Sequence, residues 1–121
     1  MTYTATEKAD VMTGRMTRLS GGSLELLGGS GQVVASVPLN TPSGTTSGAT
    51  LTFAGFPKTV TPALTGVAIA SAQLKDSAGV VRKTGLTTGL SGSGAQLILS
   101  KTTPASGDSV TVNAPLTLAD L

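Results

Sequence analysis

Short runs in which apolar and polar residues alternate fill the chain from Ser23 onward, and turn-forming residues separate the runs. In one run, Val33, Ala35, Val37 and Leu39 lie two positions apart, so they share one face of a strand. The same spacing recurs at Leu24 and Leu26, Leu51 and Phe53, Leu97 and Leu99, and Val110 and Val112. Because no helical periodicity follows Ser23, this part of the chain is restricted to short β-strands joined by turns.

The segments between these runs are rich in Gly, Ser, Thr and Pro, and they predict surface loops at residues 40–49 and 86–94 and a turn at 104–108. Residues 76–79 begin with Asp and end with Gly, as type I turns favour, so residues 64–84 are expected to form a β-hairpin. About seven or eight short strands separated by turn signals predict an all-β fold, an antiparallel two-sheet β-sandwich of jelly-roll-like architecture.

Two strands carry more detailed predictions. Pro38 has no N–H to donate to a neighbouring strand, so its strand is expected to end there or to lie at a sheet edge. Val34 is expected on the wetter face of the same strand. Residues 64–75 predict the longest strand, and its alternation places four small or aliphatic residues on one face: Ala68, Ala70, Ala72 and Leu74.

The first part of the chain has a different pattern, which predicts a short amphipathic helix. A stripe of apolar residues recurs at spacings of four and three: Ala5, Ala9, Met12, Met16 and Leu19. Thr4 and Glu7 form a capping-box signal at the start, and Gly21 with Gly22 ends the helix. The sequence therefore predicts a helical arm at residues 1–22 and a β-sandwich domain at residues 23–121. The stripe packs either on its own domain or on a neighbouring subunit.

Composition argues against an enzyme. The chain has no His and no Cys, so neither a Ser-His-Asp nor a Cys-His site can be built. The cluster Gly28-Gly29-Ser30-Gly31 lacks the lysine of a phosphate-binding loop, and no sequence pattern of a calcium loop occurs. Asp76 and Asp108 lie in turn signals, where an Asp side chain binds nearby backbone N–H groups. We expect no catalytic residue, no metal and no cofactor.

Charge and hydropathy restrict the partners. The net charge is +2, and the eight Lys and Arg residues are scattered, so we expect no nucleic-acid binding. No run approaches the roughly 18 apolar residues of a membrane span. Glu7 and Asp10 occupy the region where a signal peptide would have a basic segment and then an apolar one. We therefore expect no membrane partner.

The order of these motifs resembles a known family. A short helix precedes a Leu-x-Leu strand, an alternating Val/Ala strand, a D-S-x-G hairpin, a second Leu-x-Leu strand, a P-x-x-G-D turn and a V-T-V strand. This order resembles small β-sandwich structural proteins encoded in the head-gene region of tailed bacteriophages. The stretches that carry the resemblance are residues 23–26, 32–39, 73–81, 96–100 and 104–112.

The resemblance implies a virion protein made in the host cytoplasm. It implies a decoration, or cement, protein on the capsid surface, which stabilises the head by binding between subunits of the major capsid protein. Such proteins are commonly homo-trimers or homo-dimers and have no active site. We predict an interaction surface from the helix stripe and the polar loop at residues 40–49, made of Met12, Met16, Leu19, Thr41, Pro42, Thr45 and Thr46.

Other functions remain open at this stage. A tail-tube, tail-terminator, head-fibre or receptor-binding component of a virion fits the same small-residue strands. A ligand-binding β-sandwich module is a further alternative. Sugar binding usually involves aromatic platforms, and the only aromatic residues are Tyr3, Phe53 and Phe56, so the composition gives a sugar-binding module little support.

Overall fold

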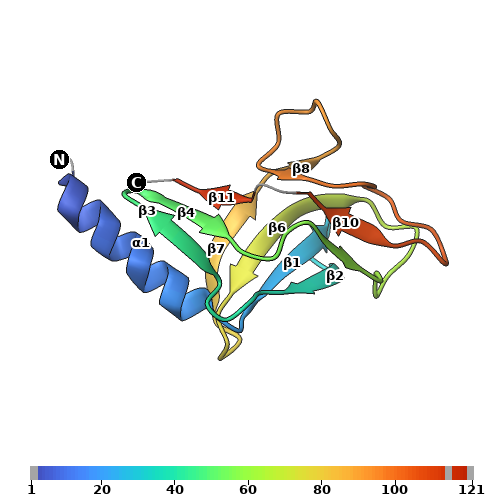
Figure 1. The fold of residues 1–121 in the computed structure, drawn as a ribbon. Helices are drawn as coiled ribbons and strands as arrows, with labels where there is room; N and C mark the ends of the chain where they lie inside the picture. Colours follow the sequence, from blue (N-terminus) through green and yellow to red (C-terminus); the bar gives the residue numbers. More distant parts are fainter. Residues whose placement is uncertain (1–2, 114–115, 120–121) are drawn as a thin grey trace.

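The computed structural model describes residues 3–113 and 116–119, which form one helix and a set of short strands (Figure 1). Most of the sheets are antiparallel, so the all-β class predicted from the sequence is confirmed. The elements are α1 (Ala5–Leu19), β1 (Ser23–Gly28), β2 (Val33–Pro38), β3 (Gly44–Ser47), β4 (Thr50–Phe53), β5 (Lys58–Val60), β6 (Ile69–Lys75), β7 (Val81–Leu86), β8 (Thr88–Gly89), β9 (Leu97–Ile98), β10 (Val110–Val112) and β11 (Thr117–Leu118).

Helix α1 begins and ends where the sequence predicts. The hydroxyl oxygen Oγ1 of Thr4 accepts a hydrogen bond from the backbone N–H of Glu7 at 3.2 Å, which satisfies a donor that the first turn leaves free. After the helix, Gly21 adopts a φ of 74°, and the N–H of Gly22 donates to the carbonyl of Leu19. A positive φ carries little steric cost in glycine, so the chain can turn sharply from the helix into β1.

A four-stranded sheet with the order β2-β1-β6-β7 forms the largest layer of strands. In the antiparallel register, Leu24 of β1 faces Val37 of β2 on one side and Leu74 of β6 on the other. All three of these side chains are buried. Strand β2 lies at the edge of the sheet, as predicted from Pro38.

Two irregularities in the register change which residues are buried. The β1–β2 register shifts at Leu26 and Leu27, and Val34 is fully buried although the alternation places it on the wetter face. The β1–β6 register shifts at Leu27 and Gly28, and Ala70 is exposed while its neighbour Ile69 is buried. Both face predictions were therefore wrong, because an irregularity in the register moves side chains to the other face of a strand.

The predicted hairpin is confirmed, with a shorter first strand than expected. Strands β6 and β7 pair across the turn at residues 76–79, where the N–H of Gly79 donates to the carbonyl of Asp76 at 3.0 Å. Residues 64–68 are not part of β6. In that segment the N–H of Gly66, whose φ is 72°, donates to the carbonyl of Pro104 instead of joining the sheet.

Residues 40–49 are not a loop throughout, so this prediction was wrong. Residues 44–47 form β3, which pairs with β4 so that Thr45 faces Thr52. Strand β11 pairs with the other side of β4, giving a sheet with the order β11-β4-β3. The two strands approach closely at Gly44, where a Cβ atom would collide with the carbonyl oxygen of Thr52.

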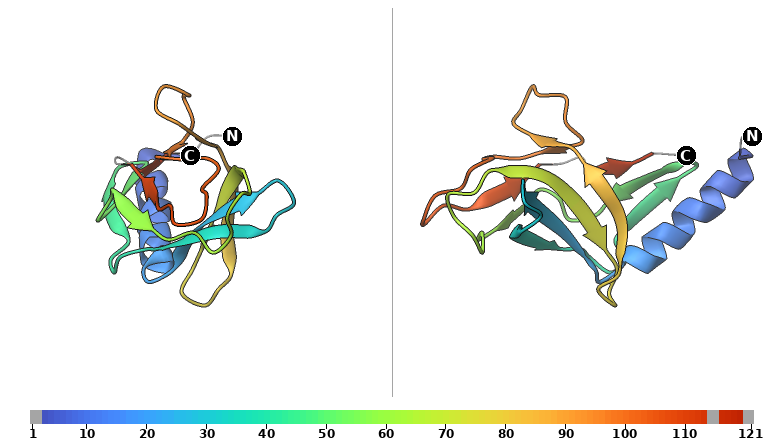
Figure 2. Two further views of the ribbon diagram at one scale, coloured as in Figure 1. Left: turned by 90° about the vertical axis from the view of Figure 1, so that its right-hand side faces the viewer. Right: turned by 180° about the vertical axis from the view of Figure 1, so that it is seen from behind.

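Two smaller strand pairs complete the described fold. Strands β5 and β10 are antiparallel, whereas β8 and β9 are parallel, which differs from the wholly antiparallel arrangement predicted. Strand β8 lies within residues 86–94, where a loop was predicted. Both views of Figure 2 show the segment that follows β8 as a loop projecting from the body of the molecule.

One hydrophobic core joins the helix to the sheets. The core takes side chains from α1, from all four strands of the β2-β1-β6-β7 sheet, and from the smaller sheets. Its members are small or aliphatic except for Phe53. Helix α1 lies at one end of the molecule beside β3 and β4, and β10 lies toward the other end (Figure 1).

Candidate interaction surface

The part of the apolar stripe of α1 from Met12 to Leu19 packs on the chain's own core, whereas Ala5 is exposed. Met12 is fully buried and Leu19 is 3% exposed, while Met16 is half-buried against the same cluster. Because α1 contacts β3 and β4, these side chains face the hairpin rather than solvent. Of the three helix residues predicted for an interaction surface, only Met16 has a substantial part accessible to a partner.

Buried Ser43 joins the end of α1 to the segment before β3. Its hydroxyl group donates to the carbonyl oxygen of Met16 at 2.7 Å, and its N–H donates to Oγ of Ser20 at 3.0 Å. Gly21 adds a backbone bond to the carbonyl of Asn40. A lone serine between Pro and Gly gives no signal of this role in the sequence, and Ser43 was not among the predicted residues.

The remaining predicted residues lie on the same side of the fold as the helix end. Thr41, Pro42 and Thr45 are exposed, and Thr46 is half-buried. Strand β3 is the last strand of its sheet, so its outer edge has no strand partner among the described residues. The structure thus places these four residues in one continuous segment next to α1, and Ser47, which sequence reasoning missed, is also exposed there.

The acidic side chains of the strand region are used in local structure. Asp76 Oδ1 accepts hydrogen bonds from the N–H groups of Ala78 and Val80 at 2.9 and 3.0 Å, and Oδ2 accepts one from Nε of Arg82 at 2.8 Å. The bond from Val80, the Arg82 side chain and the bond from Ala78 hold the pKa of Asp76 below its usual value. The turn role predicted for Asp76 is confirmed.

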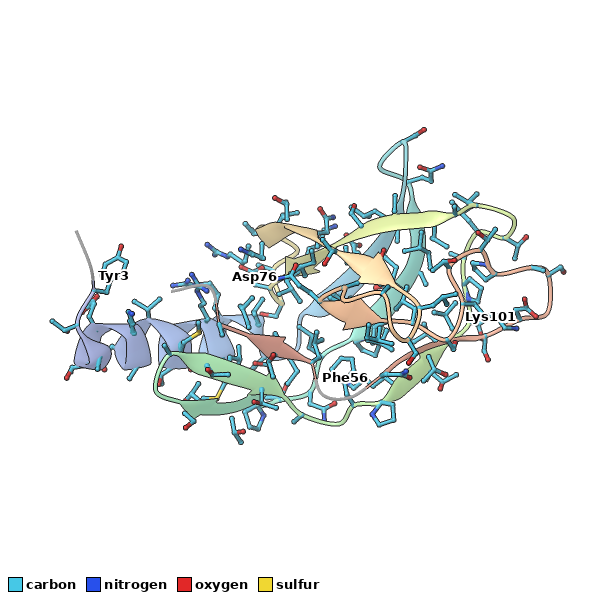
Figure 3. All side chains as sticks on the ribbon, turned by 90° about the horizontal axis from the view of Figure 1, so that it is seen from above. Tyr3, Phe56, Asp76 and Lys101 are labelled. Atoms are coloured by element: carbon cyan, nitrogen blue, oxygen red, sulfur yellow. The ribbon has the colours of Figure 1, made fainter. Side chains whose placement is uncertain are left out.

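Asp108 has an equivalent role in the turn at residues 104–108. Its Oδ2 accepts from the N–H of Ala105 at 2.9 Å, and its Oδ1 pairs with Nζ of Lys101 at 2.9 Å. These two contacts lower the pKa of the Asp108 carboxyl. Figure 3 shows Lys101 toward the end of the molecule opposite Tyr3, and Asp76 lies between them, so the two carboxylates are in separate places.

The two phenylalanine side chains pack on each other. Their ring centroids are 6.4 Å apart at an interplanar angle of 75°, and Phe53 is buried. Nζ of Lys58 lies 5.5 Å from the centroid of the Phe56 ring and also donates to the carbonyl of Pro38 and to Oδ1 of Asn40. Desolvation lowers the pKa of Lys58. Because Phe53 is buried and Nζ of Lys58 lies over the ring of Phe56, the two rings do not form an exposed platform for a ligand.

Within residues 3–113 and 116–119, no group of three or more carboxylates lies close enough together to hold a metal ion. In the same part of the chain, no helix has the length and apolar character required to cross a bilayer. No family model matches this chain, and no curated protein or solved structure matches it either.

Proposed function

We propose that this protein is a non-enzymatic structural component of a tailed-phage virion, and that it decorates the capsid by binding between subunits of the major capsid protein. The proposal rests on the order of motifs that resembles such proteins. Three of those motifs have a clear structural role: the hairpin at residues 73–81, the turn at residues 104–108 and the strand β10. The lack of His and Cys supports the non-enzymatic part of the proposal.

The observation that supports an assembly role best is the composition of the β3 edge. Exposed Thr45 and Ser47 lie on a strand that pairs only with β4 among the described residues. An unpaired edge can add a strand from another chain, and hydroxyl side chains cost little to desolvate compared with charges. Many such contacts repeated over a capsid would stabilise the shell through avidity, even if each contact is weak.

We also propose that the sheets form the two layers of a jelly-roll-like sandwich. The β2-β1-β6-β7 sheet would be one layer, and the β11-β4-β3 and β10-β5 sheets would form the other. The shared core supports this arrangement, because Leu24 and Leu74 of the first sheet join the same cluster as Leu51, Val110 and Leu118.

The experiment that tests the proposal measures assembly and particle binding together. Purified protein should form trimers or dimers in light scattering, and it should co-sediment saturably with expanded phage heads at micromolar concentration. Thr45→Lys places a charge on the β3 edge and should weaken assembly or head binding, since edge lysines oppose strand addition. Thr61→Lys is the matched control, because Thr61 is exposed outside the strands.

A monomer that ignores expanded heads would contradict the proposal. Hexameric rings together with immunogold labelling of the tail would instead favour a tail component. An equal effect of the two Thr→Lys variants would show that the β3 edge has no special part in assembly.

A further inference from the structure

The loop between β8 and β9, residues 90–96, projects from the body of the molecule (Figure 1; Figure 2). It carries no charged side chain, and all but two of its residues are Gly, Ser or Ala. Its large apolar side chain, Leu90, is 49% exposed, which makes it the most exposed leucine in the described part of the chain. Leu90 therefore adds nothing to the hydrophobic core.

Hydrogen bonds close the base of this β8–β9 loop. The N–H of Thr87 donates to Oε1 of Gln96 at 3.1 Å, and the N–H of Gln96 donates to Oγ1 of Thr87 at 2.9 Å. The N–H of Leu97 adds a bond to the carbonyl of Thr87 at 3.0 Å. Because these three bonds join the segments before and after the loop, its two ends are held in a fixed relation.

Bonds inside the β8–β9 loop order it further. The N–H of Ser93 donates to the carbonyl of Leu90 at 3.0 Å, and Oγ of Ser93 accepts from the N–H of Ala95 at 3.3 Å. A Cβ atom at Gly89 would lie 2.4 Å from the same Oγ, so the loop folds back onto β8. Ordering a loop costs conformational entropy, yet the fold orders this one with its largest aliphatic side chain in solvent.

The base of the loop carries a further cost. Oγ1 of Thr88 is buried and has no hydrogen-bond partner among the described residues. Such a group lowers stability, and natural proteins keep costs of this kind mainly at functional sites. An ordered loop also loses less entropy on binding than a flexible one. The loop thus has the properties of a binding element, in which an aliphatic anchor is held ready outside the core.

We propose that the β8–β9 loop is the part of the protein that contacts the capsid shell, with Leu90 inserted into an apolar pocket of the major capsid protein. This inference rests on the proposed function. An uncharged rim around that pocket would match the Gly, Ser and Ala residues beside Leu90, which cost little to desolvate compared with charges. Strand β3 lies beside α1, away from the loop, and its edge remains for contacts between copies (Figure 1).

The test measures co-sedimentation with expanded heads that lack this protein, over a range of protein concentrations. Leu90→Ala should raise Kd about tenfold, as expected for losing much of a buried leucine side chain. Leu64→Ala is the matched control, because Leu64 is 38% exposed in another segment, and it should leave Kd unchanged. Both variants should keep the wild-type Tm and oligomer size, since neither side chain belongs to the core.

A second measurement locates the contact directly. The chain has no cysteine, so Ser91→Cys can carry a single photo-crosslinking group on the loop. On heads, this group should crosslink to the major capsid protein. Ser77→Cys, exposed in the β6–β7 turn, is the matched control and should give little of this product.

The outcomes separate this inference from the proposed function. A wild-type chain that does not bind heads would contradict the proposed function itself. Binding of the wild-type chain with an equal Kd for Leu90→Ala would overturn only the role of the loop, as would crosslinking from Ser77→Cys but not from Ser91→Cys. Loss of the oligomer in Leu90→Ala would assign the loop to contacts between copies and would also overturn its role on the shell.

Discussion

Gly22 lies where the turn after α1 passes the end of β6. Its N–H donates to the carbonyl of Leu19, and its carbonyl accepts from the N–H of Leu39, so the residue joins the helix to the far end of β2. A Cβ atom at this position would collide with the carbonyl oxygen of Lys75 and lie 3.0 Å from Cα of Asp76. Both obstacles are backbone atoms, which cannot rotate away as a side chain can.

Gly22→Ala should therefore destabilise the protein by about 1–3 kcal/mol, the range for forcing extra atoms into a packed site. Urea unfolding followed by circular dichroism measures this loss. An unchanged midpoint would show that the β6 end moves at little cost and would contradict the close approach described for Gly22.

Gly14 provides the opposite expectation within α1. It is exposed in the helix interior, and a Cβ there would meet nothing within 4 Å. Gly14→Ala should raise the free energy of unfolding by about 0.5–1 kcal/mol, because alanine loses less backbone entropy in a helix. The same urea titration tests it, and a loss of stability would show that α1 differs from the helix described.

At the scale of elements, α1 adds side chains to the core that the strands share. Met12 is fully buried and Met16 only half-buried, although both belong to the same stripe. Met12→Ala should cost about 2–4 kcal/mol, as expected for removing a large buried side chain. Met16→Ala should cost clearly less, and it serves as the matched control on the same face.

Both methionine variants should be compared by thermal unfolding at one protein concentration, so that any oligomer is kept equal. Equal losses for the two variants would mean that the helix is not seated on the β3–β4 hairpin as described.

The elements that sequence reasoning found are those with local signals. Thr4 and Gly22 mark the ends of α1 through bonds within a few residues. The β6–β7 turn is likewise specified by residues 76–79, where Asp76 binds N–H groups two and four positions ahead. Such contacts require no knowledge of the rest of the chain, so the pattern of residue types is sufficient.

The elements that sequence reasoning missed have no apolar alternation of their own, whether their partner strand is near in the sequence or far away. Strand β3 consists of Gly, Thr and Ser residues with no apolar alternation, and its pairing with β4 and contact with α1 make it a strand. Strand β5 pairs with β10, which lies about half the chain away. The extra residue at Arg82 follows from the β6–β7 register and has no signal of its own in the sequence.

For the whole molecule, the two low-pKa carboxylates predict how stability depends on pH. Asp76 and Asp108 have pKa values below the usual 3.8 in the folded protein, so the unfolded chain binds protons more readily. Their stabilising contribution is present above about pH 5 and is lost as pH falls through the folded pKa values. Tm should therefore decrease steadily below about pH 4.

Asp76→Asn isolates one of these carboxylates. Asparagine keeps an oxygen for the N–H groups of Ala78 and Val80 but loses the ion pair with Arg82. At pH 7 the variant should have a lower Tm than the wild-type protein. The difference between the two Tm values should become smaller as the pH falls, because acid protonates the wild-type carboxyl. Differential scanning calorimetry from about pH 7 to 2.5 measures both. A gap that stays constant or widens in acid would contradict a lowered pKa at Asp76.

The position of β1 in its sheet has a consequence for synthesis on the ribosome. Its partner β2 emerges directly after it, but its other partner comes from β6, where Gln73 bonds to Glu25 across 48 positions. At roughly 5–20 residues per second, translation delays that second pairing by about 2–10 s. During this interval one side of β1 is open to strands of other nascent chains. Slowing elongation before Ile69 would therefore reduce the yield of soluble protein, whereas slowing it after Lys75 would not.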